Sequence, residues 1–304
     1  MKVVFDIYKP IIKMNQFKIF IDLTRLKKPI GFMLLFWPCS WGLALACLYT
    51  QDFKNFYIFL TLYFLGSVLM RSAGCIVNDI VDRKIDNKIK RTKNRPIAAK
   101  KISVQNSLLY VLSLCLFAFI ILIQFNKLTI LLGMLSMLLA FSYPYMKRIT
   151  YWPQLFLGLT FNWGIIMAWT SINNNFSIEI IVLYISAIFW TLGYDTIYGA
   201  QDIADDEIIG VKSTAIKFKK NLKVFVGLCY AVSSVLILFL FFYKMTINIF
   251  SMFSLIFIFS LIYQLKIFDP RDPKTCLKAF KFNNWSGMIL FLGLFGLSFN
   301  IGTI

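Results

Sequence analysis

Long apolar stretches alternate with short polar segments along the chain. A helix needs about 20 mostly apolar residues to cross the hydrocarbon core of a bilayer, and nine stretches meet this requirement. Several connections are so short that the helices they join must run antiparallel. The pattern therefore predicts an all-α, polytopic membrane protein, a bundle of nine transmembrane helices at residues 29–49, 57–78, 104–124, 128–146, 153–171, 178–198, 222–243, 246–264 and 283–302.

Composition narrows the chemistry that such a bundle can perform. Apolar residues make up 59% of the 304 residues and charged residues only 15%, against about 25% charged in soluble domains, which excludes an ordinary soluble protein. The sequence has no histidine, which excludes histidine triads, His-ligated zinc and haem ligation by histidine. The six cysteines show no metal-ligand spacing. Any chemistry must therefore rely mainly on carboxylates, amides, arginine, lysine or tyrosine.

The distribution of lysine and arginine sets the expected topology. Cytoplasmic loops retain these residues, and a cytoplasmic N-terminus places 28 of the 32 on that side. We expect residues 1–28 to form a cytoplasmic N-terminal segment and residues 29–304 a membrane domain, in the bacterial inner membrane. The N-terminal segment could lie on the membrane as an interfacial helix or remain a solvated leader. Topology and membrane lipid headgroups account for the net charge of +18, so we expect no nucleic-acid partner, and no obligate protein partner is evident.

The acidic residues are concentrated in two places. Eight of the 14 lie in two short stretches that each continue from an apolar span into a predicted cytoplasmic segment. If the helix continues, the first stretch carries polar side chains at i, i+4 and i+8 from Asn78, and the second at i, i+7 and i+11 from Asp195. Each set would then share one helical face. The eight residues are Asp79, Asp82, Asp86, Asp195, Asp202, Asp205, Asp206 and Glu207.

Such clustering needs a counter-charge. Like charges on one helix face destabilise the helix, and carboxylates near hydrocarbon are costly. Magnesium prefers oxygen ligands, takes one or two carboxylates and completes its shell with water and substrate phosphates. Two acidic helix ends that face each other would hold a magnesium-bound diphosphate between them. The alternative interpretation is a solvated loop at the membrane boundary, which the helical spacing of both acidic sets makes the weaker one.

Arg71 stands apart from the other basic residues because it lies about two turns inside a predicted span. An arginine there is expensive and normally lines a cavity, where it pairs with an anion. It lies seven residues before Asn78, on the same helical face as the first acidic set. Its partner could be a nearby aspartate within the protein or the carboxylate of a small substrate bound in the same cavity.

Three motifs then occur in order at compatible spacing. They are Asn78-Asp79-x-x-Asp82-x-x-x-Asp86 followed by Arg95-Pro96, then Tyr143-Pro144-Tyr145-x-Lys147-Arg148, and finally Tyr194-Asp195-Thr196 through Asp202 and Asp206 to Lys212-Ser213-Thr214. With the opening Arg25–Gly31, they resemble the UbiA superfamily of intramembrane prenyltransferases, and most of all its 4-hydroxybenzoate polyprenyltransferases. One departure is the run Ala98-Ala99-Lys100-Lys101, where relatives often carry a glycine.

The resemblance implies a fold and an activity. The helices would surround a central cavity that opens laterally to lipid and is capped by cytoplasmic loops. The enzyme would transfer a polyprenyl group from polyprenyl diphosphate to the ring carbon ortho to the hydroxyl (C3) of 4-hydroxybenzoate, with Mg²⁺ as cofactor, in ubiquinone biosynthesis. Diphosphate would be released.

The resemblance also implies roles for individual residues. Catalytic candidates are Asp195, Arg71 and Lys147. Substrate-binding candidates are Arg71, Arg91, Tyr143, Lys147, Arg148 and Tyr198. Metal-ligand candidates are Asn78, Asp82, Asp202 and Asp206, with Asp79 and Asp86 supporting.

Two other functions stay open at this point. One is a prenyltransferase of the same superfamily that acts on a quinone precursor, haem or a lipid acceptor. The other is a cation-coupled transporter that uses membrane carboxylates. Transporters place such groups near the bilayer midplane, often on broken helices, whereas these carboxylates follow the ends of predicted spans beside basic loops. The sequence therefore favours the enzyme.

Overall fold

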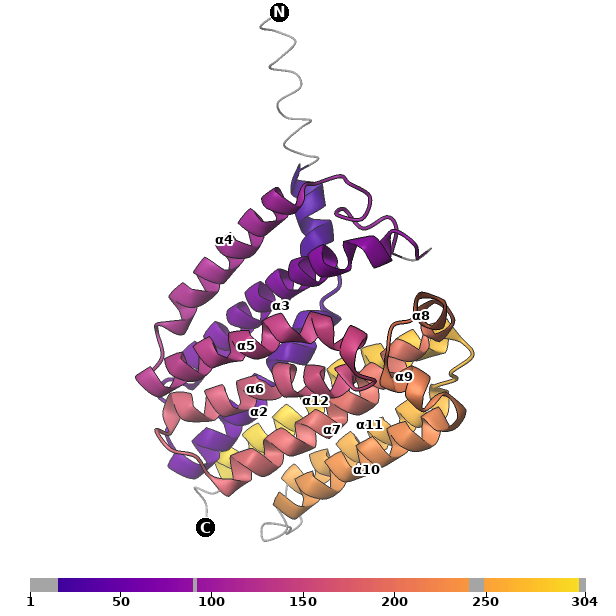
Figure 1. Ribbon diagram of the computed structural model, residues 1–304. Coiled ribbons are helices and arrows are strands. Elements are labelled where there is room, and N and C mark those ends of the chain that lie inside the picture. Colours follow the sequence, from indigo (N-terminus) through magenta and orange to yellow (C-terminus); the bar gives the residue numbers. More distant parts are fainter. Residues whose placement is uncertain (1–15, 90–91, 241–248, 301–304) are drawn as a thin grey trace, which may run out of the picture.

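The structure, a computed structural model, describes residues 16–89, 92–240 and 249–300, and within these ranges every regular element is a helix (Figure 1). Residues 16–24 form a short helix before the first long one. Short helices α8 (Ile203–Ile209) and α9 (Thr214–Lys217) and the 3-10 turn η1 (Lys219–Asn221) lie between α7 and α10. The long helices are α2 (Ile30–Thr50), α3 (Phe56–Asp86), α4 (Val104–Leu122), α5 (Lys127–Ile149), α6 (Pro153–Ile172), α7 (Ile178–Ala200), α10 (Leu222–Leu240), α11 (Ile249–Ile267) and α12 (Pro273–Asn300).

Eight of these helices, α2 to α7, α10 and α11, are long and apolar enough to cross a membrane. The chain is therefore an integral membrane protein, and the predicted all-α class is confirmed. Helix α12 is also long, but its polar side chains interrupt the apolar run and face protein partners. Asn283 accepts a hydrogen bond from Trp190 Nε1 (2.8 Å), and the Ser286 hydroxyl lies 2.7 Å from that of Ser260. The predicted count of nine spans stays a prediction.

Local sequence signals start several of these helices. Ser103, Asn126 and Ser177 each precede a helix, and each side-chain oxygen accepts a hydrogen bond from the backbone N–H three residues later. Helix α2 is the most buried span and packs against α3, α6 and α12. A Cβ at Gly42 would lie 2.3 Å from the Ile165 carbonyl oxygen, so only glycine permits the close approach of α2 and α6.

The two acidic stretches are built differently. Helix α3 runs without a break for 31 residues, about 46 Å at 1.5 Å per residue, which exceeds the hydrocarbon core of about 30 Å. The predicted continuation to Asp86 is therefore confirmed. Helix α7 ends at Ala200, and α8 begins at Ile203. The predicted single face from Asp195 to Asp206 is wrong, because Asp202 adopts non-helical angles (φ −112°, ψ 4°), consistent with the preference of aspartate for helix starts.

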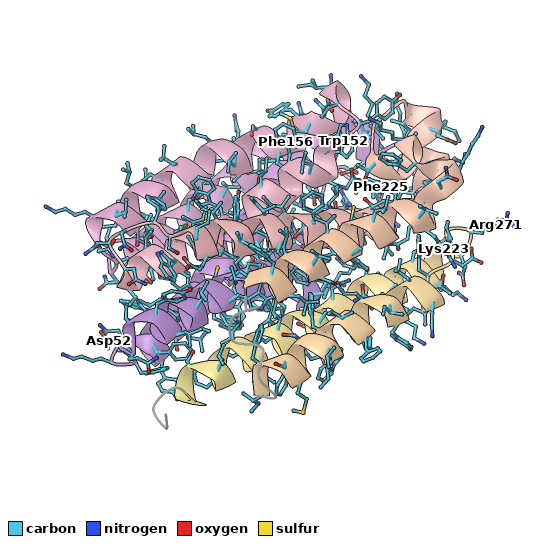
Figure 2. All side chains as sticks on the ribbon, turned by 90° about the horizontal axis from the view of Figure 1, so that it is seen from below. Asp52, Trp152, Phe156, Lys223, Phe225 and Arg271 are labelled. Carbon is cyan, nitrogen blue, oxygen red and sulfur yellow. The ribbon has the colours of Figure 1, made fainter. Side chains whose placement is uncertain are left out.

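Both acidic stretches nevertheless reach the same end of the bundle. The C-terminal end of α3 and helices α8 and α9 lie together on the right of Figure 1. In Figure 2, Lys223 and Arg271 lie at one end of the bundle and Asp52 at the opposite end. The basic segments that the sequence assigns to one side therefore flank the acidic helix ends.

Candidate active site

A cavity of about 1450 Å³ extends from this end of the bundle into its interior, lined by side chains of α2 to α7 and α12 and by the segments around them. Among the predicted site residues, Arg91 lies outside the described residues, and Arg148 does not line the cavity. The remaining predicted residues all line it. They are Arg71, Asn78, Asp79, Asp82, Asp86, Tyr143, Lys147, Asp195, Tyr198, Asp202 and Asp206.

Asp82 lies at the mouth of the cavity and is only 1% exposed. Its carboxylate forms an ion pair with Lys147 Nζ at the C-terminal end of α5, where the helix dipole favours a positive charge. Arg148, on the outer side, donates to the Val81 carbonyl oxygen (2.9 Å) and lies 3.5 Å from Asp82 Oδ1. Arg148 therefore supports Asp82 from outside the cavity, whereas Lys147 and Asp82 face the space where a ligand can bind.

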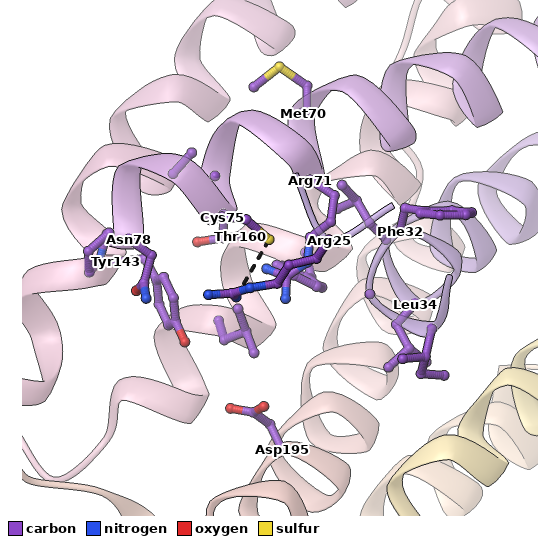
Figure 3. Close-up of a pocket in the computed structure, with 18 of the residues that line it drawn as sticks. Arg25, Phe32, Leu34, Met70, Arg71, Cys75, Asn78, Tyr143, Thr160 and Asp195 are labelled. Carbon is purple, nitrogen blue, oxygen red and sulfur yellow. Dashed lines mark hydrogen bonds between the residues drawn. The ribbon is translucent and has the colours of Figure 1, made fainter. Parts of the chain in front are cut away.

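Asp79 and Asp86 are held by two arginines that the sequence did not single out as site residues. Arg25 Nη2 donates to Asp79 Oδ1, and Arg25 Nη1 lies 3.6 Å from Cys75 Sγ (Figure 3). Arg95 Nη1 lies 3.1 Å from Asp79 Oδ1 and 2.9 Å from Asp86 Oδ2. The sequence signals were the presence of both arginines in the resemblance motifs and the position of Arg95 shortly after the first acidic set.

The groups around Arg25 favour its charged form. Burial lowers the pKa of the Arg25 guanidinium, but neighbouring groups, including the Asp79 carboxylate, outweigh burial and raise this pKa above its ordinary value. Arg25 therefore stays protonated, although most of its surface is covered.

Deeper in the cavity, Arg71 and Asp195 approach the same space from α3 and α7, with Asn78 and Tyr143 beside them (Figure 3). The Arg71 guanidinium lies over the Phe161 ring at 5.3 Å. A Cβ at Gly31 would lie 2.8 Å from Arg71 Nε, so glycine on α2 makes room for this side chain. Within the described ranges Arg71 forms no ion pair with a carboxylate. A ligand anion therefore has a charged partner here.

The interior part of the cavity is apolar. Its walls come from α3, α4, α5 and α6, and Gly66 leaves open space where a side chain would otherwise project. An extended hydrocarbon chain matches this lining, because such a chain needs no polar partners. Apolar residues of this part include Met70, Cys115, Phe119, Leu122, Met134, Met137 and Met167.

The donor set of the mouth fits a hard divalent cation. In the described part of the chain, no three acidic or thiol groups lie close enough together to hold a metal ion by themselves. Mg²⁺ requires only one or two carboxylates, because water and phosphate oxygens complete its octahedron. Asn78 and Asp82 on α3 face the same cavity as Asp202 and Asp206. One amide and three carboxylates from two parts of the chain thus line the cavity, enough to supply the one or two carboxylates that a Mg²⁺ ion needs.

A helical membrane bundle with this cavity defines the class of protein. The sequence matches the UbiA prenyltransferase family over residues 35–287, so the chain belongs to this family. It is 39% identical to the 4-hydroxybenzoate octaprenyltransferase of Vibrio atlanticus, over 91% of this chain and 96% of the relative. It is also 39% identical to the mitochondrial 4-hydroxybenzoate polyprenyltransferase of Rattus norvegicus, over 90% of this chain and 73% of the relative.

A solved structure has the same fold. The UbiA homolog from Archaeoglobus fulgidus bound to GPP and Mg²⁺ superposes with a TM-score of 0.69 at 16% identity. The match covers 94% of this chain and 100% of that one. Because the shared architecture extends over nearly the whole chain, the helical bundle is the fold of this solved homolog too.

Proposed function

We propose that this protein transfers a polyprenyl group from polyprenyl diphosphate to C3 of 4-hydroxybenzoate, in ubiquinone biosynthesis. The observation that carries this proposal is the cavity, which joins a mouth rich in carboxylates and basic groups to an apolar interior, with Arg71 and Asp195 between them. A diphosphate suits the mouth, a prenyl chain suits the interior, and a small aromatic acid suits the space between. The names of the curated relatives support the same donor and acceptor.

The mouth binds the donor headgroup. Asn78, Asp82, Asp202 and Asp206 would hold Mg²⁺, which neutralises charge on the diphosphate as it leaves. Lys147 would donate to the phosphate oxygens, where negative charge grows in the transition state. Tyr143, which lines the cavity beside it, supports the same headgroup.

Two further substrate-binding candidates belong to this donor site. Tyr198 lines the cavity from α7, and Arg91 is the remaining candidate for the diphosphate. Together with Lys147, these groups would orient the headgroup so that the allylic carbon points toward the acceptor.

The acceptor site lies between Arg71 and Asp195. Arg71 would bind the carboxylate of 4-hydroxybenzoate and so orient the ring. The allylic C–O bond of the donor breaks, and its electron pair leaves with the diphosphate. The ring carbon ortho to the hydroxyl forms the new C–C bond, and the proton on that carbon passes to Asp195. The apolar walls exclude water from the allylic cation, which water would otherwise capture.

We also propose the membrane placement that the charge distribution favours. The mouth faces the cytoplasm of a bacterial inner membrane, nine helices span the bilayer, and residues 1–28 stay on the cytoplasmic side. The basic residues gathered at the mouth end support this orientation.

A reconstituted assay tests the function. Purified protein in liposomes receives Mg²⁺, a polyprenyl diphosphate and either 4-hydroxybenzoate or 4-hydroxybenzyl alcohol, which lacks the carboxylate. We expect a prenylated product from the acid, identified by mass, and little from the alcohol. Absence of product from folded protein would overturn the proposal. Equal amounts of product from both acceptors would show that Arg71 does not bind the acceptor carboxylate.

A further inference from the structure

We propose that Asp79 and Asp86 hold the cover of the cavity in place through ion pairs with Arg25 and Arg95, and that these two carboxylates are not metal ligands. We call this set of ion pairs the clasp. The cover consists of residues 16–28 and 92–101, and parts of both segments line the cavity mouth. This inference rests on the proposed function, because it assigns different roles to the residues of the first acidic set. Asn78 and Asp82 would remain for the cation, and Arg25 and Arg95 become positioning residues.

The contacts themselves carry the argument. Asp79 is 2% exposed and receives both arginines on the same oxygen, Oδ1. Arg95 Nη1 bridges Asp79 and Asp86, two turns apart on α3. Each arginine comes from a different segment of the cover. Asp82 also has basic partners, Lys147 and Arg148, but both come from α5 within the bundle. A metal ion at Asp79 or Asp86 would instead break the ion pairs that hold the cover.

Apolar packing brings the two segments to α3 but does not orient them over the mouth. Leu23 and Ile97, one from each segment, are buried in one cluster with Ile76 of α3. Their packing is non-directional, whereas a hydrogen-bonded ion pair fixes an orientation. The clasp, together with the hydrogen bond that the Thr92 hydroxyl donates to the Asp86 carbonyl oxygen (3.1 Å), is therefore the part of the contact that sets where the cover lies.

Backbone strain at the cover supports the same assignment. Arg25 has a φ of 55°, in the left-handed region that glycine occupies most easily. It follows the helix of residues 16–24, a position where glycine commonly ends a helix. An arginine there keeps a strained backbone while its side chain reaches into the cavity (Figure 3). Such strain persists only when the surrounding contacts enforce it.

The experiment uses hydrogen–deuterium exchange of the substrate-free full chain in nanodiscs, together with Mn²⁺ binding measured by EPR. For Arg25→Gln and Asp79→Asn, we expect about tenfold faster exchange in residues 16–28 and 92–101, from the loss of a charged hydrogen bond. Mn²⁺ affinity in the presence of diphosphate should stay within about threefold of the unmodified protein. Asp82→Asn should do the reverse and lower Mn²⁺ affinity with little change in exchange. Lys93→Gln, an exposed residue of the same segment, is the charge-matched control and should change neither.

Two further variants keep the result interpretable. Arg25→Gln/Asp79→Asn removes both charges, so no unpaired buried charge remains and folding is preserved; its exchange should match the single variants. Arg25→Gly relaxes the strained backbone but removes the clasp, and it should also open the cover. The proposal fails if Asp79→Asn lowers Mn²⁺ affinity as much as Asp82→Asn, or if Arg25→Gly leaves exchange unchanged. Neither readout requires turnover. A failure of the proposed function would therefore be detected separately, as absence of product from the unmodified protein.

Discussion

The two acidic helix ends supply the same cavity but are organised in opposite ways. Helix α3 stays continuous to Asp86, and its three aspartates are buried with basic partners. The second end breaks between α7 and α8, so Asp195 lies within α7 and Asp202 precedes α8. The unbroken end fixes its three carboxylates along two turns of one helix. The broken end distributes carboxylates between the mouth and the acceptor site.

This difference has a physical origin. A continuous helix that carries carboxylates on one face must neutralise them, and Arg25, Arg95 and Lys147 come from three other segments to do so. The break after α7 leaves Asp195 inside the span and places Asp202 at the start of α8. Helix α3 therefore also holds neighbouring segments together, whereas the break between α7 and α8 mainly determines how deep in the cavity each carboxylate lies.

The largest expected effect comes from removing one carboxylate on each wall. Asp82→Ala and Asp202→Ala should each lower turnover by about 10³-fold, because each removes charge stabilisation at the departing diphosphate. Steady-state product formation measures this. Asp82→Ala should also lower thermal stability, because it leaves Lys147 without its buried partner.

The control for this pair is Glu207→Gln. Glu207 forms an exposed ion pair with Lys219 (2.8 Å), and such pairs contribute little. Its turnover should stay within about twofold of the unmodified protein. An unchanged rate in either aspartate variant would show that one wall of the mouth does not take part in catalysis.

A smaller effect should separate the two functions of Lys147. Lys147→Gln should lower turnover by about 10²-fold, because it removes a donor to the phosphate. The same change removes a positive charge that competes for Asp82, so Mn²⁺ affinity measured by EPR should rise. Arg148→Gln, which contacts Asp82 from the exposed side, should change both quantities far less. A loss of Mn²⁺ affinity in Lys147→Gln would contradict this explanation.

A substitution of Arg71 tests the acceptor site, which α3 and α7 form together. Arg71→Ala should raise KM for 4-hydroxybenzoate about 30-fold, as expected for the loss of a charged hydrogen bond, while KM for the polyprenyl diphosphate changes little. The alcohol that lacks the carboxylate should show no such penalty. If KM for the acid is unchanged, the carboxylate binds elsewhere.

Much of this organisation could be predicted from the sequence. The features that could not be predicted depend on local backbone breaks or on contacts between distant parts of the chain. Hydrophobic runs located the helices, and helical spacing placed Asn78, Asp82 and Asp86 on one cavity wall. Spacing failed at Asp202, because a short polar side chain there begins a new helix and periodicity does not detect such a break. The roles of Arg25 and Arg95 also escaped detection. Arg25 is 54 residues from Asp79, and only the folded chain shows which of many basic residues reaches it.

The smallest expected effect concerns the cover over α3. Lys100 lies in the cover and has a φ of 56°. Lys100→Gly should relieve a left-handed backbone penalty of about 1–2 kcal/mol, partly offset by the greater freedom of glycine in the unfolded chain. Amide exchange in residues 95–101 should therefore slow by about two- to fivefold. Lys101→Gly is the matched control, because Lys101 has no positive φ to relieve, and it should speed exchange. Faster exchange in Lys100→Gly would mean that the lysine side chain, and not the backbone angle, holds this turn.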